Sequence, residues 1–151
     1  MSSPEHVVTV ARVIAAPADA LYAAWTDAAV MSRWMGKVTA ADGRVGGRYR
    51  IEHDAGGAIY VHKGEYRVLE PARRIVQTFA AGPAEGEPAD EVSGNEELVE
   101  LRLRALDAAR TEVTLINSWS GPELEADAMG AVEKAWSHWL ELLDRAISTP
   151  S

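Results

Sequence analysis

The chain has 151 residues, 47% of them hydrophobic and 25% charged, values typical of a single globular domain. It has no cysteine, which excludes disulfides, thiolate nucleophiles and zinc–thiolate sites. The formal net charge of −8, without a basic stripe, argues against nucleic-acid binding, and no apolar run is long enough to span a membrane. The polar start lacks the features of a secretory signal, so we expect a cytoplasmic protein.

The first part of the chain predicts a strand followed by two short helices. Residues 7–14 are rich in β-branched side chains, which favour a strand. Pro17 suits the start of a helix, because the N–H that proline lacks would be unpaired there. Asp27 is the expected N-cap of a second helix that runs to about Trp34 and is ended by Gly36.

Alternating polar and apolar residues then predict further strands, for about six or seven in all. We expect them at residues 48–53, 59–69, 75–79, 98–106 and 112–119. Residues 80–95 are rich in glycine, proline and acid, which predicts a flexible loop. The acids beside it, Glu96 and Glu97 among them, are expected on a solvated surface.

The last predicted element is a helix from about residue 123 to residue 147 with a broad apolar face. Trp139 lies on the flank of this face, which carries Met129, Val132, Trp136, Leu140, Leu143 and Ile147. Sequential antiparallel strands twist and bend, and a long apolar helix can cover their concave side. The sequence therefore predicts an α+β fold in one domain, with a curved antiparallel sheet wrapped on the C-terminal helix.

Several motifs follow one another in a familiar order between Val7 and Ala146. They are Ala20-Leu-Tyr-Ala-Ala-Trp-Thr-Asp27, Arg33-Trp-Met-Gly36, Gly46-Gly-Arg-Tyr-Arg50, Gly64-Glu-Tyr66, Glu70-Pro-Ala-Arg-Arg-Ile-Val-Gln-Thr-Phe79, Thr111-Glu-Val-Thr-Leu115 and Trp136 to Leu143. Together they resemble the family homologous to the C-terminal domain of the Hsp90 ATPase activator, within the START and Bet v 1-like SRPBCC superfamily. The resemblance implies the helix-grip fold. The co-chaperone has a further N-terminal domain that this chain lacks, so Hsp90 activation is not expected.

Strand parity predicts which side chains face the helix. Tyr60, Gly64 and Val68 share the inward side of one strand with His62 and Tyr66, and Ile51 and His53 point inward from the strand before it. Candidate ligand-binding residues are the aromatic, polar or flexible side chains on the predicted inward faces. They are Trp34, Tyr49, His62, Tyr66, Asn117, Trp119, Met129, Trp136 and Leu140.

The two histidines of the central hairpin are candidates for holding a metal ion together. A turn around Ala55 and Gly56 would place His53 and His62 four residues apart along the sheet, on the order of 13 Å. Zinc–nitrogen bonds are about 2 Å long, so one ion could not reach both. We therefore expect no metal site, and no motif indicates a cofactor or a confident catalytic residue.

Three functions fit this pattern. The first is a protein that holds a hydrophobic small molecule (lipid-like, polyketide-like or aromatic) in an aromatic-lined cavity between sheet and helix. The second is a cyclase-, aromatase- or hydrolase-like enzyme that uses His62 with Tyr66 as an acid–base pair. The third is a protein-interaction or stress-related module, which includes a homodimer; it predicts tryptophans exposed in one apolar patch.

Overall fold

The structure, a computed structural model, describes residues 5–85, 97–120 and 126–147. Strands and helices alternate in the expected order of strand, two helices, strands and a final helix. In chain order they are β1 (Glu5–Ile14), α1 (Ala18–Thr26), α2 (Ala28–Met31), β2 (Lys37–Ala41), β3 (Arg48–Ala55), β4 (Ala58–Glu70), β5 (Arg74–Thr78), β6 (Ala80–Pro83), β7 (Leu98–Asp107), β8 (Arg110–Ser120) and α3 (Ala126–Ile147).

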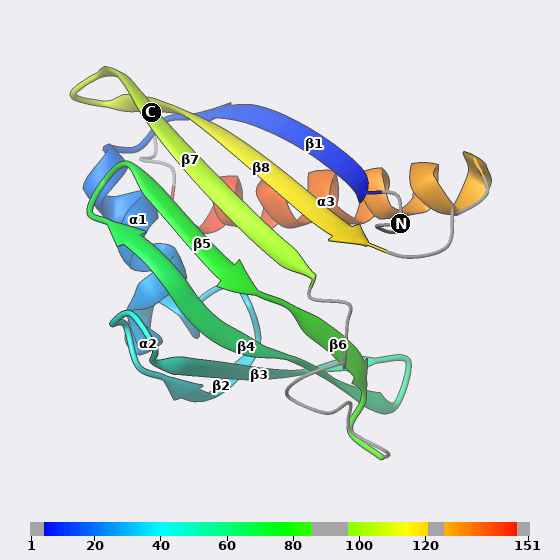
Figure 1. Ribbon diagram of the computed structural model, residues 1–151. Coiled ribbons are helices and arrows are strands. Elements are labelled where there is room, and N and C mark those ends of the chain that lie inside the picture. Colours follow the sequence, from blue (N-terminus) through cyan, green and yellow to red (C-terminus); the bar gives the residue numbers. More distant parts are fainter. Residues whose placement is uncertain (1–4, 86–96, 121–125, 148–151) are drawn as a thin grey trace.

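One antiparallel sheet of eight strands forms the body of the protein. The strands are ordered β1-β8-β7-β5-β4-β3-β2, and β6 pairs with β4 beside this path. The sheet curves so that α3 lies behind it, while α1 and α2 close one end (Figure 1). This arrangement confirms the predicted α+β helix-grip fold.

The sequence missed two short strands. β2 is an edge strand whose side chains are half-buried or exposed, so it has no regular alternation to recognise. β6 falls in the segment predicted as a loop, because glycine, proline and alanine carry little strand signal. β6 forms because β4 extends past the end of β5, and this extension of β4 pairs with β6. The second helix also ends earlier than predicted, at Met31. Residues 86–95 of the predicted loop and the predicted helix start at residue 123 lie outside the described residues.

β4 changes partners at Gly64. Residues 66–70 pair with β5, and residues 60–63 pair with β6. A Cβ atom added to Gly64 would lie 2.0 Å from the carbonyl oxygen of Thr78, far inside van der Waals contact. Glycine is therefore required at the point where the sheet bends.

The bend also changes the parity of β4. The register with β5 shifts between Tyr66 and Val68, and such an irregularity moves the following side chains to the other face. Leu69 packs against the core in the place predicted for Val68. The prediction for Val68 was wrong because a regular alternation was extended through this irregularity.

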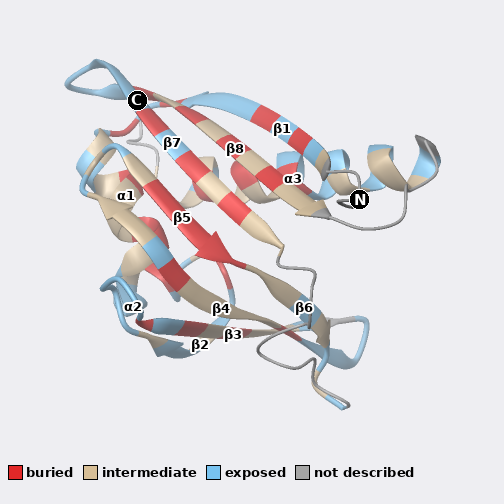
Figure 2. Ribbon diagram, viewed as in Figure 1, coloured by how far each residue is buried: buried red, intermediate tan, exposed pale blue. Residues whose placement is uncertain are grey.

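The core lies between the inner face of the sheet and α3. Buried residues form bands across the middle of β5, β7 and β8 (Figure 2). Trp136, Leu140 and Leu143 of α3 are 7%, 1% and 0% exposed, which confirms the predicted apolar face of this helix. In the part of the chain described here, no helix is both long and apolar enough to cross a membrane.

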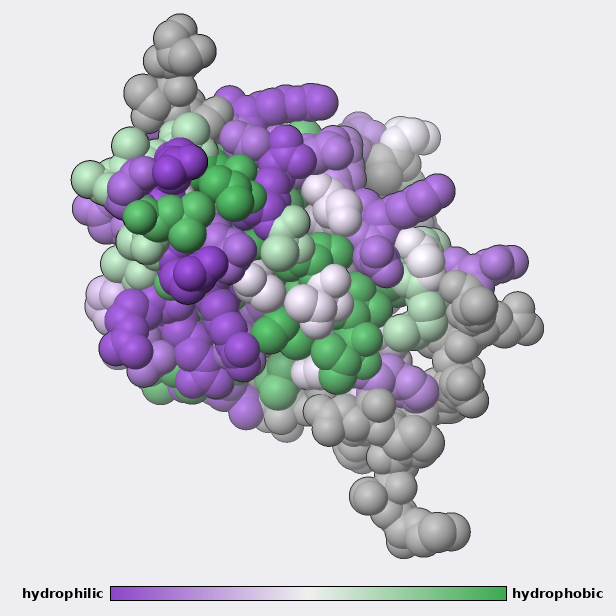
Figure 3. Space-filling model, turned by 90° about the horizontal axis from the view of Figure 1, so that it is seen from above, coloured by the Kyte–Doolittle hydropathy of each residue, from purple (hydrophilic) through white to green (hydrophobic). Residues whose placement is uncertain are grey.

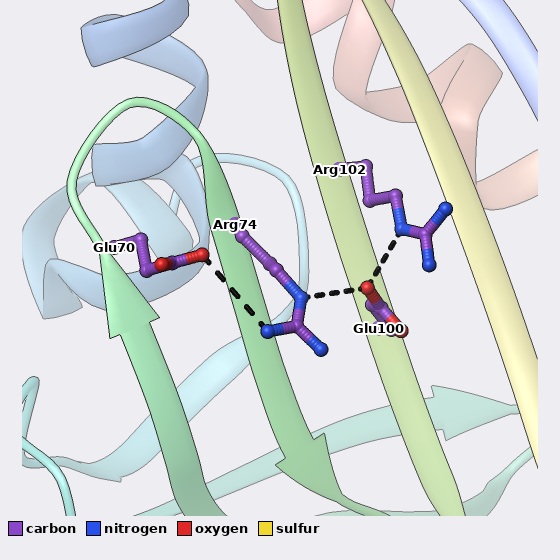
Figure 4. A network of polar contacts seen from close by, with 4 residues as sticks. All are labelled: Glu70, Arg74, Glu100 and Arg102. Atoms are coloured by element: carbon purple, nitrogen blue, oxygen red, sulfur yellow. Dashed lines mark hydrogen bonds and ion pairs between the residues drawn. The ribbon is translucent and has the colours of Figure 1, made fainter.

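The outer face of the sheet carries charged side chains that pair with one another. Arg74 and Arg102 each donate a hydrogen bond from Nε to Oε2 of Glu100, both at 2.7 Å (Figure 4). A guanidinium nitrogen of Arg74 also lies 3.9 Å from Oε1 of Glu70. These residues point away from α3 and keep the outer face polar.

Candidate functional site

The inner side of the sheet encloses a small central cavity beside α1, α2 and α3. Its walls are almost entirely aromatic or apolar. They consist of Trp25, Met31, Met35, Tyr49, Ile51, His62, Tyr66, Gln77, Phe79, Trp136 and Trp139. The cavity has a volume of about 10 Å³, which is at the lower limit for one water molecule. Side chains therefore nearly fill the space in which a ligand was predicted.

Two buried tyrosines form one wall of the central cavity. The hydroxyl of Tyr66 donates to the carbonyl oxygen of Trp25 at 2.7 Å, and that of Tyr49 donates to the carbonyl of Thr78 at 2.6 Å. The ring centroids of the two tyrosines lie 5.5 Å apart. Burial raises the pKa of both phenols, so both stay protonated and hold their donor role at neutral pH.

Two residues that line the cavity each have one buried side-chain atom without a hydrogen-bond partner. These atoms are Nε1 of Trp25 and Oε1 of Gln77. These residues are 3% and 5% exposed, so bulk water does not reach them readily. Leaving such a group unpaired costs about 1–3 kcal/mol, and each unpaired group in a folded protein calls for an explanation. One is a donor and the other an acceptor.

Three half-buried aromatic residues close the cavity on its more exposed side, and we call them the closing rings: His62, Phe79 and Trp139. The imidazole of His62 is stacked on the indole of Trp139, with centroids 5.1 Å apart and an interplanar angle of 25°. Phe79 meets His62 edge-on at 5.2 Å. The rings come from β4, from the junction of β5 and β6, and from α3, so three separate elements meet at this closure.

The central hairpin brings His53 and His62 together, which corrects the predicted separation. Gly56 and Gly57 both have positive φ, 69° and 92°, and form a two-residue turn. His53 then pairs with Tyr60, and His62 lies two residues farther along. The two Nε2 atoms are 3.2 Å apart. The prediction of about 13 Å was wrong because the turn was placed too early and the diagonal contact was overlooked.

In this histidine pair, the imidazole of His62 is uncharged at neutral pH. Burial, followed by repulsion from His53, lowers the pKa of His62 to about 4. One imidazole must then donate and the other accept in the Nε2–Nε2 hydrogen bond.

The acid–base pair suggested for His62 and Tyr66 is not formed. The Tyr66 hydroxyl donates to the Trp25 carbonyl instead, and the ring nitrogen of His62 faces His53. Four residues along one strand are too far apart for direct contact, because a strand rises about 3.3 Å per residue.

A chain of hydrogen bonds leads away from the cavity through Asn117. Nε1 of Trp136 donates to Oδ1 of Asn117 at 3.0 Å, and Nδ2 of Asn117 donates to Oε2 of Glu97 at 2.9 Å. Burial raises the pKa of Glu97, and the hydrogen bond from Asn117 opposes this. Glu97 was expected on a solvated surface; it is instead half-buried against β8.

Comparisons with known proteins agree with this architecture. The family model of the activator of Hsp90 ATPase homolog 1-like proteins matches residues 15–148. The chain belongs to this family. No curated protein sequence matches it.

Solved structures share the START/Bet v 1-like fold of this family member. Protein CV1439 from Chromobacterium violaceum is 21% identical, with a TM-score of 0.74 over 95% of this chain and 99% of that one. The Aha1 dimer from Colwellia psychrerythraea is 17% identical, with a TM-score of 0.67 over 95% and 96% of the two chains. DynU16, a protein in the dynemicin biosynthetic locus, is 23% identical, with a TM-score of 0.67 over 94% of this chain and 47% of that one.

The predicted site residues of this family member fall into two groups. Four line the central cavity: Tyr49, His62, Tyr66 and Trp136. The others do not line it. Asn117 is hydrogen-bonded to Trp136 of the cavity wall, and Met129 and Leu140 pack in the core. Trp34 donates from Nε1 to the carbonyl of Ala24 at 2.9 Å. The Trp119 ring lies 5.8 Å from that of His6.

Sequence reasoning left out several residues that line the cavity. They are Trp25, Met31, Met35, Ile51, Gln77, Phe79 and Trp139. Strand parity contained the signal for Gln77, because residues 75, 77 and 79 share one face of β5 and its extension. Met31 ends the short α2 and Met35 follows it, and a helix of four residues gives no clear periodicity.

Proposed function

We propose that this protein binds a planar, mainly apolar aromatic molecule in the central cavity. The observation that carries the proposal is the pair of unpartnered polar atoms, the indole N–H of Trp25 and the amide oxygen of Gln77. A ligand with one acceptor and one donor would satisfy both. The surrounding walls supply aromatic faces, against which a flat ring can stack. The ligand-binding fold of the family supports the same function.

Binding requires the closing rings to move, because a cavity of about 10 Å³ holds no ligand as it stands. Pockets for small molecules span about 300–1,000 Å³. The closing rings are only half-buried, so they can turn outward with less loss of packing than the buried Tyr49 or Tyr66. Met31 and Met35 on the other side have flexible side chains that adapt to a guest.

The test uses a matched pair of probes, 7-hydroxycoumarin and coumarin, which share a planar bicycle and a carbonyl acceptor. Only the first carries the hydroxyl that can donate to Gln77. We expect 7-hydroxycoumarin to bind in calorimetry and to raise the melting temperature with concentration. Coumarin should bind about 10-fold more weakly, the effect of about one lost hydrogen bond.

Variants assign the binding to the cavity. Gln77→Met should bring the affinity for 7-hydroxycoumarin close to that for coumarin, and Trp25→Phe should weaken both probes. Trp119→Phe is the matched control, because Trp119 does not line the cavity. The proposal fails if neither probe binds, or if Gln77→Met and Trp25→Phe both bind the probes as the unmodified protein does.

We infer self-association as a second candidate property, supported by apolar side chains on the outer side of β1. Val7 and Val13 are each 50% exposed and share one face of this edge strand. The side of the molecule on which β1 lies shows apolar surface clustered among hydrophilic side chains (Figure 3). The similar protein from Colwellia psychrerythraea forms a dimer.

Analytical ultracentrifugation tests this second property. The unmodified protein should change from monomer to dimer as its concentration rises, and Val7→Ser with Val13→Ser should shift that transition to higher concentration. Ile59→Ser, at a side chain 42% exposed on β4, is the control that should leave it unchanged. A monomer at every concentration would rule self-association out.

A further inference from the structure

We propose that His53 and His62 together bind one divalent transition-metal ion. Their Nε2 atoms lie 3.2 Å apart. Two histidine nitrogens on one zinc ion, with bonds of about 2.0–2.1 Å and a tetrahedral angle, are separated by about 3.3–3.4 Å. The spacing of the pair is therefore already that of two ligands on one ion, which would replace the proton that the two rings share.

The hairpin and its neighbours hold both imidazoles in place. The two-residue turn fixes the register that makes the histidines diagonal neighbours. Gly36 leaves room beside His53, since a Cβ at Gly36 would lie 3.2 Å from the Cβ of His53. Trp139 stacks on the ring of His62. The broad χ2 torsion of histidine lets each ring turn to aim its nitrogen at a shared ion.

The donor set limits the metal to those that imidazole prefers. Neutral imidazole nitrogens suit Zn²⁺, Cu²⁺ and Ni²⁺, whereas Mg²⁺ and Ca²⁺ require oxygen ligands. Within the described residues, no group of three or more histidine, cysteine or acidic side chains could hold a metal. The site is therefore an open one, with two protein ligands and the remaining positions left to water. The formal net charge of −8 favours approach of a cation.

This site shares one residue, His62, with the proposed ligand-binding cavity. Its other residue, His53, does not line the central cavity. Metal binding and aromatic-ligand binding can therefore fail separately.

The test is a Zn²⁺ titration of the full chain by calorimetry at pH 7.5. The chain has four histidines, so the other two provide the matched control. The double variant His6→Ala with His138→Ala should bind one equivalent of Zn²⁺ as the unmodified protein does. His53→Gln and His62→Gln should each lower the affinity at least 10-fold, with melting curves to show that both variants fold.

Nitrogen NMR of the histidine rings provides a readout on the unmodified protein. Added Zn²⁺ should shift the ring nitrogens of His53 and His62 together, at one equivalent. The proposal is overturned if only His6 or His138 responds. It is also overturned if His53→Gln and His62→Gln bind Zn²⁺ as tightly as the unmodified chain.

Discussion

The two faces of the central sheet treat their polar groups in opposite ways. On the outer face, Arg74 and Arg102 share the carboxylate of Glu100, and each charge has a partner within 2.7 Å. On the inner side, Gln77 of β5 and Trp25 of α1 each leave a polar atom unpaired although they are almost fully buried. The outer side chains are fully paired although water could satisfy their hydrogen bonds. The inner side chains are left unpaired where water does not reach them readily.

Under the proposed function, this contrast separates groups that stabilise the fold from groups that would bind a ligand. Exposed ion pairs contribute about 0–1 kcal/mol, so the outer network stabilises the fold only slightly. Buried unpaired atoms lower stability and persist only where something else requires them. The inner face of β5 and α1 is therefore where the function is expected, and the following predictions test the contrast from the largest effect to the smallest.

The largest effect is expected at Gly64, where β4 changes partners and the sheet bends. Gly64→Ala would place a methyl group 2.0 Å from the Thr78 carbonyl, which neither backbone can accommodate without moving. We expect a loss of several kcal/mol of unfolding free energy, at the upper end of single substitutions. Gly130→Ala on α3, where an added Cβ meets no atom within 4 Å, is the control and should stabilise. Equal melting temperatures for the two variants would contradict this account of the bend.

Asn117→Ala should have the next largest effect. It leaves the Trp136 indole N–H without its acceptor and removes the hydrogen bond to Glu97. Removing one partner of buried groups costs about 1–3 kcal/mol each. Denaturant unfolding measures the loss, and an Asn117→Ala variant as stable as the parent would show that the chain of hydrogen bonds contributes nothing.

Glu100→Gln on the outer face should cost less than Asn117→Ala. It removes the charge that Arg74 and Arg102 share, but all three side chains are partly solvated. We expect a loss of about 1 kcal/mol or less, and less still at high salt, because salt screens exposed charges. A loss larger than that of Asn117→Ala would reverse the contrast between the faces.

Gln77→Met should be close to neutral for stability although the residue is only 5% exposed. Methionine has a similar shape and removes the unpaired acceptor. We expect the unfolding free energy to stay within about 1 kcal/mol of the parent while binding of 7-hydroxycoumarin weakens. A large loss of stability would show that Gln77 serves packing rather than binding.

The last prediction stands outside this ranking of substitutions, because it concerns pH and the half-buried ring of His62. Its pKa is lowered from 6.5 to about 4, so the native state resists a proton that the unfolded state accepts. The stabilising effect of the neutral ring is fully present above pH 6.5 and is lost as the pH falls toward 4. Melting curves between pH 7 and pH 5 should show this loss in the metal-free protein, and His62→Phe should reduce it. An NMR titration of His62 with a midpoint near 6.5 would contradict the prediction.

The overall fold could be read from the sequence because long periodic segments dominate it. β-Branched strand residues, the alternation of β4 and the apolar face of α3 all act over many residues, so local errors do not change the topology. The family motifs predicted the same fold independently of these residue patterns.

The site could be read only in part, because it depends on single-residue details. The position of the Gly56–Gly57 turn decides whether His53 meets His62, and the irregularity after Tyr66 decides which side chain faces inward. The unpaired state of Trp25 and Gln77 depends on where neighbouring polar atoms lie in space, which no sequence pattern specifies.

A crystal structure of the protein with 7-hydroxycoumarin tests the central claim most directly. We predict the coumarin in the central cavity, its carbonyl accepting from Nε1 of Trp25 and its hydroxyl donating to Oε1 of Gln77, with the closing rings turned outward. A structure in which His62, Phe79 and Trp139 keep their present packing and the coumarin lies elsewhere, or is absent at saturating concentration, would contradict it.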